Sequence, residues 1–148
     1  MAFRTIAYNV LQCTGYPKGA PAALGAPESF ARALGGYAPD IITFAESPPE
    51  AVVATIAREM GMRHVFFPST GRWPGALLTR FDIEAVEAHR RRGDSRLPEE
   101  FTRHWGRVAL LTDGGERLVV HSIHLHPSDA SIRGREVLAV LEDLSAAV

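Results

Sequence analysis

The spacing of hydrophobic residues changes along the chain, and of all sequence features this change most limits which folds the chain can adopt. Before Gly61, two short apolar runs alternate with two segments in which apolar residues recur every three or four positions. These spacings are typical of strands and helices respectively. After Gly61, strand patterns dominate until a last helical pattern near the C-terminus. We therefore expect a layered α/β or α+β domain, in which helices flank a mixed β-sheet with an antiparallel middle.

The expected elements follow from these patterns and from the turn residues between them. Strands are predicted over 3–11, 40–45, 64–67, 75–79, 83–89, 105–112 and 118–125, and helices over 27–37, 49–60 and from 129 to the last residues. Asp113, Gly114 and Gly115 predict a hairpin turn between the last two strands.

The same patterns predict burial. Apolar residues on both sides of segment 3–11 indicate a strand that is buried on both faces. Phe30, Leu34 and Tyr37 share one stripe of the first helix, and Ser128 can cap the last helix. The inward face of that last helix is expected to consist of Val137, Leu138, Leu141 and Leu144.

Composition and charge exclude several classes of protein. The 148 residues, 46% of them hydrophobic, are enough for one packed domain over 1–148. The 16 basic and 17 acidic residues nearly cancel, so no global field draws the chain to nucleic acid or an anionic membrane. The single cysteine, Cys13, excludes an intrachain disulfide and a multi-cysteine zinc site. With no signal-peptide pattern and no transmembrane segment in the sequence, the cytoplasm is the expected location.

Three apolar strands each end in one polar residue that can bind a metal or a phosphate, namely Asn9, Glu46 and His124. Ligands collect beyond the carboxyl ends of strands in open α/β sheets, so these side chains could converge on one site. A carboxylate suits Mg²⁺, an amide can orient a phosphate oxygen, and an imidazole exchanges protons near neutral pH. Each residue taken singly is more often a strand cap, whereas the three together describe metal-assisted hydrolysis.

Four segments carry a family resemblance. Residues 3–10 (FRTIAYNV) and 39–46 (PDIITFAE) resemble the opening strand and the "PDIv.LqE" strand of the endonuclease/exonuclease/phosphatase superfamily, which has the DNase I-like fold. Residues 75–83 (GALLTRFDI) are similar to its "G.aiLSRfpi" hairpin strand, and residues 118–127 (LVVHSIHLHP) to the strand that ends in "tHL". The four motifs occur in the family's order and cover nearly the whole chain.

The resemblance implies a layered DNase I-like sandwich and a phosphoester hydrolase that depends on Mg²⁺, with Mn²⁺ as the alternative cation. By this resemblance Glu46 binds the cation, Asn9 helps to place the cation and the phosphate, and His124 acts on the phosphoryl group. The implied substrate is a nucleic acid, a phospholipid headgroup or a small phosphodiester. No stable protein partner is predicted.

Two family motifs have no counterpart in the sequence. The "GDFN" and "SDH" motifs, which follow "tHL" in the family, do not occur before Val148. We therefore expect a truncated domain that lacks the C-terminal part of the fold and leaves one sheet edge and some apolar surface uncovered. Such a chain is expected to be inactive or nearly so on its own, and it could instead serve as a non-catalytic binding or assembly module.

A zinc hydrolase is the other alternative, because His124 and His126 have the H-x-H spacing of several zinc sites. His121 alternates away from His124 and is expected on the opposite face of the strand. Residues 90–103 are too polar for a core, so their basic side chains are expected in a solvated loop rather than on a phosphate.

Trp73 and Trp105 could stack on a base or a sugar, but positions in the core or at its rim are favoured. The chain contains no G-x-S-x-G, Walker A or C-x5-R motif, so covalent serine or cysteine catalysis has no support.

Overall fold

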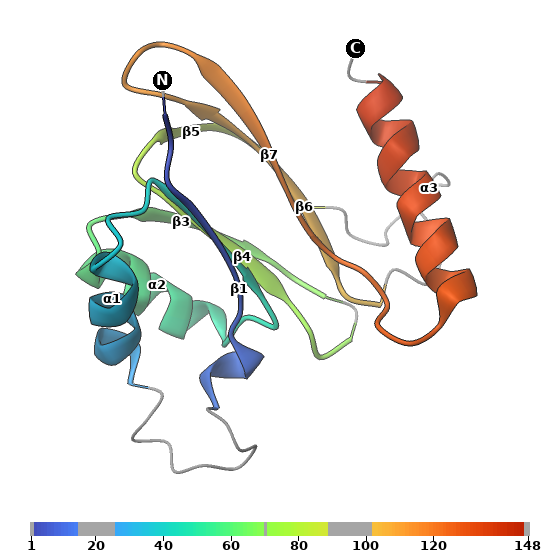
Figure 1. Ribbon diagram of the computed structural model, residues 1–148, viewed down its shortest axis with the longest axis horizontal. Helices are drawn as coiled ribbons and strands as arrows, with labels where there is room; N and C mark the ends of the chain where they lie inside the picture. The colour runs from blue at the N-terminus through green and yellow to red at the C-terminus, as the bar shows by residue number, and fades with distance from the viewer. Residues whose placement is uncertain (1, 15–25, 70, 89–101, 147–148) are drawn as a thin grey trace.

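The computed structural model describes residues 2–14, 26–69, 71–88 and 102–146. The expected loop over 90–103 therefore lies almost entirely outside the described residues. Two β-sheets are stacked face to face, with helices on the outside of each sheet (Figure 1). The elements are β1 (Thr5–Asn9), η1 (Leu11–Cys13), α1 (Pro27–Gly35), β2 (Ile41–Ala45), α2 (Glu50–Glu59), β3 (Arg63–Phe67), β4 (Gly75–Thr79), β5 (Asp82–Ala88), β6 (His104–Leu111), β7 (Arg117–His124) and α3 (Ala130–Ala146).

The first sheet has the strand order β1-β2-β4-β3. β1 and β2 are parallel, whereas β4 runs antiparallel to both β2 and β3. α1 and α2 cover one face of this sheet and share a core with it, made of residues such as Leu34, Ile42, Phe44, Val53, Ile56 and Leu78. The other face of the sheet packs on the second sheet, so the central strands are buried on both faces. This burial explains the unbroken apolar run of β2.

The second sheet is an antiparallel meander with the order β5-β6-β7. Its inner face contributes Val108 and Leu110 to a second core, which also holds Ile41, Val65, Phe67, Leu77 and Phe81. The link after Thr79 carries the chain from one sheet to the other, so segment 75–83 does not form a hairpin. β6 and β7 are joined by the turn at residues 113–116, which confirms the hairpin predicted there.

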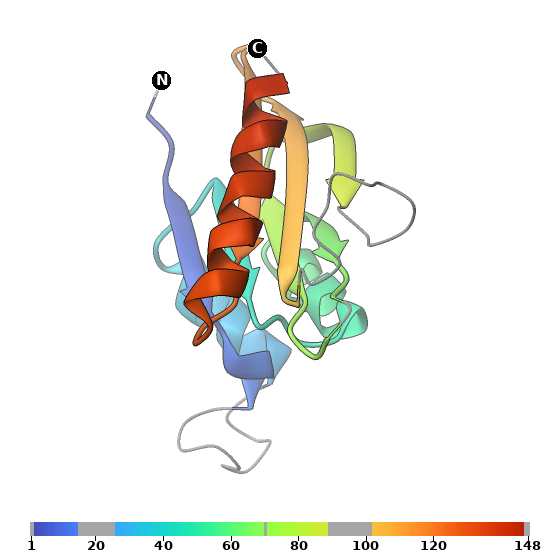
Figure 2. The ribbon, with the colours of Figure 1, turned by 90° about the vertical axis from the view of Figure 1, so that its right-hand side faces the viewer.

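α3 lies along the outer face of the second sheet (Figure 2), where Ala139 and Val140 pack against Trp105. The predicted inward face of this helix is wrong, because Val137, Leu138, Leu141 and Leu144 are all exposed. The N-cap lies one residue beyond the expected position. Asp129 rather than Ser128 caps the helix, since its Oδ1 accepts the N–H groups of Ser131 and Ile132 at 2.8 and 3.0 Å.

β1 is an exposed edge strand, which corrects the prediction that it is buried on both faces. Among the described residues it pairs only with β2, and Tyr8 is 50% exposed. β7 is likewise an edge strand of its sheet. Between the two edges runs a cleft of about 390 Å³, lined by Phe3, Ile6, Ile41, Leu118 and Val120 among others.

Two smaller findings concern the helices. α1 ends at Gly35, and Tyr37 is 71% exposed, so Tyr37 does not extend the buried stripe as predicted. Within the described part of the chain, no helix has both the length and the apolar character needed to cross a membrane.

Candidate active site

The polar strand ends lie at one rim of the sandwich. β1 and β2 are parallel with Asn9 in register with Ala45, and Glu46 follows Ala45 directly. The amide and the carboxylate therefore belong to the same end of the first sheet. In the second sheet, His124 ends β7 and pairs with His104 at the start of β6. Asn9, Ala45 and His104 line one cleft, which brings the two sheets' contributions together.

A left-handed turn follows β1. Leu11, Gln12 and Cys13 have φ values of 44°, 55° and 58°, a conformation that costs an ordinary residue roughly 1–2 kcal/mol. Asn9 Oδ1 accepts the Leu11 N–H at 3.1 Å, and the Gln12 N–H donates to the Glu46 carbonyl at 2.6 Å. Glu46 itself has a φ of 52°. These bonds tie the backbone that carries Asn9 to the backbone that carries Glu46.

Glu46 faces Arg103 across the gap between the sheets. Arg103 Nη1 lies 4.0 Å from Glu46 Oε1, and each side chain is only 13% exposed. The guanidinium lies over the Trp73 ring, 4.5 Å from its centroid, and the buried Nη1 has no hydrogen-bond partner among the described residues. A guanidinium held against an indole with a free N–H can bind a phosphate oxygen. The assignment of Arg103 to a solvated loop is therefore wrong, because Trp73 shields it from water.

His124 is only partly exposed, with an unsatisfied ring nitrogen. Burial lowers the pKa of His124 below its ordinary value, and Arg103 acts in the same direction, whereas Glu46 and Glu136 oppose both. Its buried Nδ1 has no hydrogen-bond partner in the described part of the chain. A neutral imidazole of this kind can accept or donate one hydrogen bond to a ligand.

His104 stands behind His124 and is almost completely buried. Its ring stacks on Phe67 with centroids 6.2 Å apart, and its Nε2 lies 3.1 Å from Ser122 Oγ. The His104 and His124 rings meet edge to face, 5.9 Å between centroids. The ring also fills the space above Gly75, where a Cβ atom would collide with it. Burial and then the charge of His124 lower the pKa of His104 to about 4, so it is neutral near pH 7.

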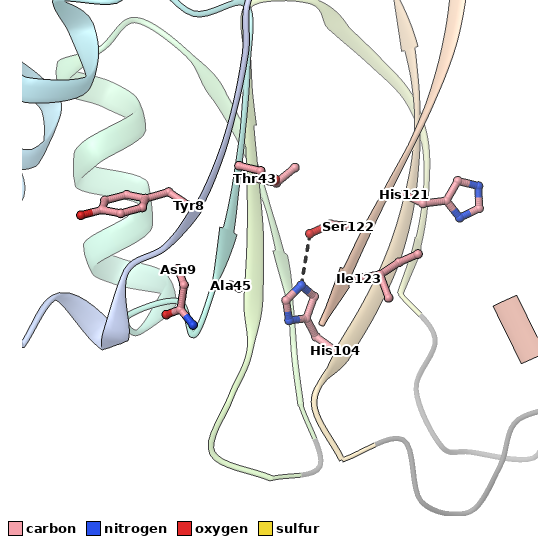
Figure 3. A pocket seen from close by; sticks show the side chains of 9 residues that line it. Tyr8, Asn9, Thr43, Ala45, His104, His121, Ser122 and Ile123 are labelled. Carbon is pink, nitrogen blue, oxygen red and sulfur yellow. Dashed lines mark hydrogen bonds between the residues drawn. The ribbon is translucent and has the colours of Figure 1, made fainter. Parts of the chain in front are cut away.

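A cleft of about 370 Å³ opens beside these groups, between the ends of β1 and β2 on one side and parts of β6 and β7 on the other. Asn9 and His104 lie on opposite sides of it, and the His104–Ser122 hydrogen bond forms part of one wall (Figure 3). His121 borders the cleft but its ring turns outward, where its Nδ1 accepts the Trp105 indole N–H at 3.3 Å. This confirms the expected orientation of His121. Trp105 belongs to the core and Trp73 to the rim, as favoured from the sequence.

The donor set fits a hard cation better than zinc. No group of three or more His, Cys, Asp or Glu side chains could hold a metal among the residues that the structure describes. Mg²⁺ commonly binds one or two carboxylates of the protein and takes waters and substrate oxygens as its other ligands. Glu46 can supply such a carboxylate. His126 Nδ1 accepts the Asp129 N–H at 3.0 Å, so this nitrogen is engaged within the chain.

Two stacked sheets with outer helices, and a polar rim where β1, β2 and β7 end, define the DNase I-like class of fold. Solved structures agree. The chain has the fold of an endonuclease/exonuclease/phosphatase from Beutenbergia cavernae (TM-score 0.70, 12% identity, 95% of this chain and 43% of that chain). It is also similar to an endonuclease/exonuclease/phosphatase family protein from Leptotrichia buccalis (TM-score 0.64, 13% identity, 95% of this chain and 61% of that chain). A third similar structure is humanized D. rerio TDP2 (TM-score 0.70, 16% identity, 95% of this chain and 58% of that chain). The resemblance stated from the motifs is thus confirmed at the level of the fold.

The chain spans 43% to 61% of the length of these three structures. No family model and no curated protein matches the sequence.

Proposed function

We propose that the rim holds a divalent cation, Mg²⁺ or Mn²⁺, and hydrolyses a phosphoester. This proposal rests on the proximity of Glu46, Arg103 and His124. Glu46 directly follows β2, Arg103 directly precedes β6, and His124 ends β7. A carboxylate, a guanidinium and an imidazole that converge at the rim of this fold match the needs of a phosphoryl group. The first can hold a cation, and the other two can bind or protonate phosphate oxygens.

Each residue then has a distinct role. Glu46 ligates the cation, which when bound polarises a phosphoryl oxygen. Arg103 directs its unbonded N–H at the phosphate, and its contact with Trp73 prevents the side chain from swinging into solvent. The Asn9 NH₂ group can donate to a phosphate oxygen or to the Glu46 carboxylate, because its Oδ1 already accepts the Leu11 N–H. His124, held neutral by burial, can pass a proton to or from the phosphoryl oxygens.

The substrate class is a phosphodiester such as a nucleic acid, a phospholipid headgroup or a small diester. TDP2 and the endonuclease/exonuclease/phosphatase structures share the fold, which supports this class. The chain has no "GDFN" or "SDH" motif, so we expect weak turnover or none from this polypeptide alone. Binding is therefore the sharper test.

Calorimetry with Mn²⁺ and Mg²⁺ is the experiment that tests the cation site. Glu46→Gln should weaken Mn²⁺ binding by about tenfold or more, since a loss of about 1.4 kcal/mol is tenfold. Glu59→Gln, at an exposed site on α2, is the matched control and should bind as the wild type does.

Two other outcomes would contradict the proposal. Tight Zn²⁺ binding that is abolished by His126→Ala would favour the zinc alternative. If no divalent cation binds, the chain would be better explained as a non-catalytic binding module.

A further inference from the structure

Glu136 is the most deeply buried carboxyl group in the described structure and takes no part in the chemistry above. It lies on α3, is 0% exposed, and is the only acidic residue among the buried polar side chains that the structure describes. Its Oε2 accepts the His126 N–H at 2.6 Å, and its Oε1 accepts the Thr102 N–H at 3.4 Å. One carboxylate thus joins the backbone segment that precedes β6 to the segment that follows β7.

The burial of Glu136 inverts the pattern expected for an outer helix. α3 exposes four large apolar side chains, with Leu138 at 60% and Leu141 at 51%, yet it buries this acidic one. Burying a carboxylate is unfavourable unless hydrogen bonds replace its water. A leucine at this position would dock the helix without that penalty. The carboxylate therefore points to a requirement for acceptors at this place, beyond the docking of α3.

Arg133 completes the arrangement one turn earlier on the helix. Its Nη1 donates to the carbonyl oxygens of His126 and Pro127, each at 3.1 Å. Because residues three apart share a face of a helix, Arg133 and Glu136 both bond the backbone of His126. The N–H and the C=O of His126 are thus both bonded to α3.

The two segments held in this way flank the candidate site. Thr102 directly precedes Arg103, and His126 lies two residues after His124. We propose that Glu136 is a positioning residue, whose carboxylate fixes the entry to β6 against the exit from β7 and so sets Arg103 and His124 in register. The inference rests on the proposed function only in taking these two side chains as the ones that bind the phosphate.

The test is a comparison of Glu136→Gln and Glu136→Leu with the wild type by amide hydrogen exchange and by NMR of the Arg103 and His124 side chains. Loss of a net hydrogen bond should speed exchange at the His126 amide by about tenfold. Glu136→Leu should speed exchange at the Thr102 and His126 amides and shift both side-chain signals. Glu136→Gln keeps one acceptor oxygen and should restore part of the protection.

Glu142→Gln is the matched control, because Glu142 is an exposed residue of the same helix. It should leave the Thr102 and His126 amides unchanged. If Glu136→Leu also leaves them unchanged, or if exchange rises uniformly through both sheets, Glu136 has no positioning role. Should Glu136→Leu fail to fold, Glu136→Gln decides the question by selectively faster exchange at the Thr102 and His126 amides.

A Mn²⁺ titration followed by NMR separates this inference from the proposed function. Mn²⁺ near Glu46 should broaden the Asn9 and His124 signals in the wild type. In Glu136→Leu the broadening of Asn9 should persist while that of His124 changes. Absence of broadening in the wild type would defeat the metal proposal alone, and the amide exchange would still decide the role of Glu136.

Discussion

Replacing Gly75 with alanine tests whether the packing of His104 holds the two sheets together at the rim. A Cβ on Gly75 would collide with three atoms of the His104 ring, Nε2, Cδ2 and Cε1. The ring cannot simply swing away, because it stacks on Phe67 and its Nε2 is bonded to Ser122. Either the ring moves and breaks that bond, or β4 shifts.

The cost of this change can be worked from its parts. Overpacking a core by one methyl group costs typically about 1–3 kcal/mol, and a buried polar group left unpaired costs about 1–3 kcal/mol more. We therefore expect Gly75→Ala to lower the free energy of unfolding by roughly 2–6 kcal/mol, a large part of the roughly 5–15 kcal/mol of an ordinary domain. Urea unfolding followed by tryptophan fluorescence measures it.

Two further variants make this prediction sharp. Gly134→Ala is the matched control, because Gly134 lies in α3 and a Cβ added there would meet nothing within 4 Å, and it should stabilise the helix by up to about 1 kcal/mol. In a His104→Ala background the added methyl group meets no ring and breaks no ring hydrogen bond, so most of the roughly 2–6 kcal/mol cost of Gly75→Ala should disappear there. Equal costs in the two backgrounds would refute the reasoning.

Three other predictions follow from single residues. The unfolded chain protonates His104 at a pKa near 6.5 and the folded chain only at about 4, so stability should fall by roughly 3 kcal/mol as the pH drops through that window. Urea titrations across this pH range measure the effect. A free energy of unfolding that does not change with pH, or that changes as steeply in His104→Gln as in the wild type, would contradict this. Burial raises the pKa of the Cys13 thiol to about 11, so iodoacetamide at a mildly alkaline pH should label it far more slowly in the native than in the urea-unfolded protein. Leu138→Glu should change the free energy of unfolding by less than about 0.5 kcal/mol, and a larger loss in the same titration would mean that this face of α3 is covered.

The strands are predictable where both faces pack. β4 occupies the predicted range 75–79, and β2 lies within 40–45, because a continuous apolar run leaves few alternatives to a central strand. β1 shows the limit of that reasoning. Its segment also has apolar residues on both sides, yet it lies at a sheet edge, and a local pattern does not reveal how many neighbours a strand has. The inward face of α3 escapes prediction for a related reason, since the helix packs on Trp105 through Ala139 and Val140 rather than through its leucines.

The candidate site is predictable as a set of strand ends but not as a set of contacts. Asn9, Glu46 and His124 can be singled out because each interrupts an apolar strand at its end. Arg103 cannot, because only the position of Trp73 in space shows that its guanidinium is shielded. His104 precedes the predicted start of β6 by one residue, although counting back in steps of two from Val108 places its side chain on the inner face.

The left-handed turn after β1 has a consequence for attempts to make the protein more heat-resistant. Three consecutive side-chain-bearing residues held at positive φ store roughly 3–6 kcal/mol of backbone strain. Glycine in place of Leu11 or Gln12 would release part of it, and a screen for thermal tolerance would therefore select such changes. The Gln12 N–H would still donate to the Glu46 carbonyl in such variants, so the gain in heat tolerance is expected to leave the arrangement of the rim unchanged.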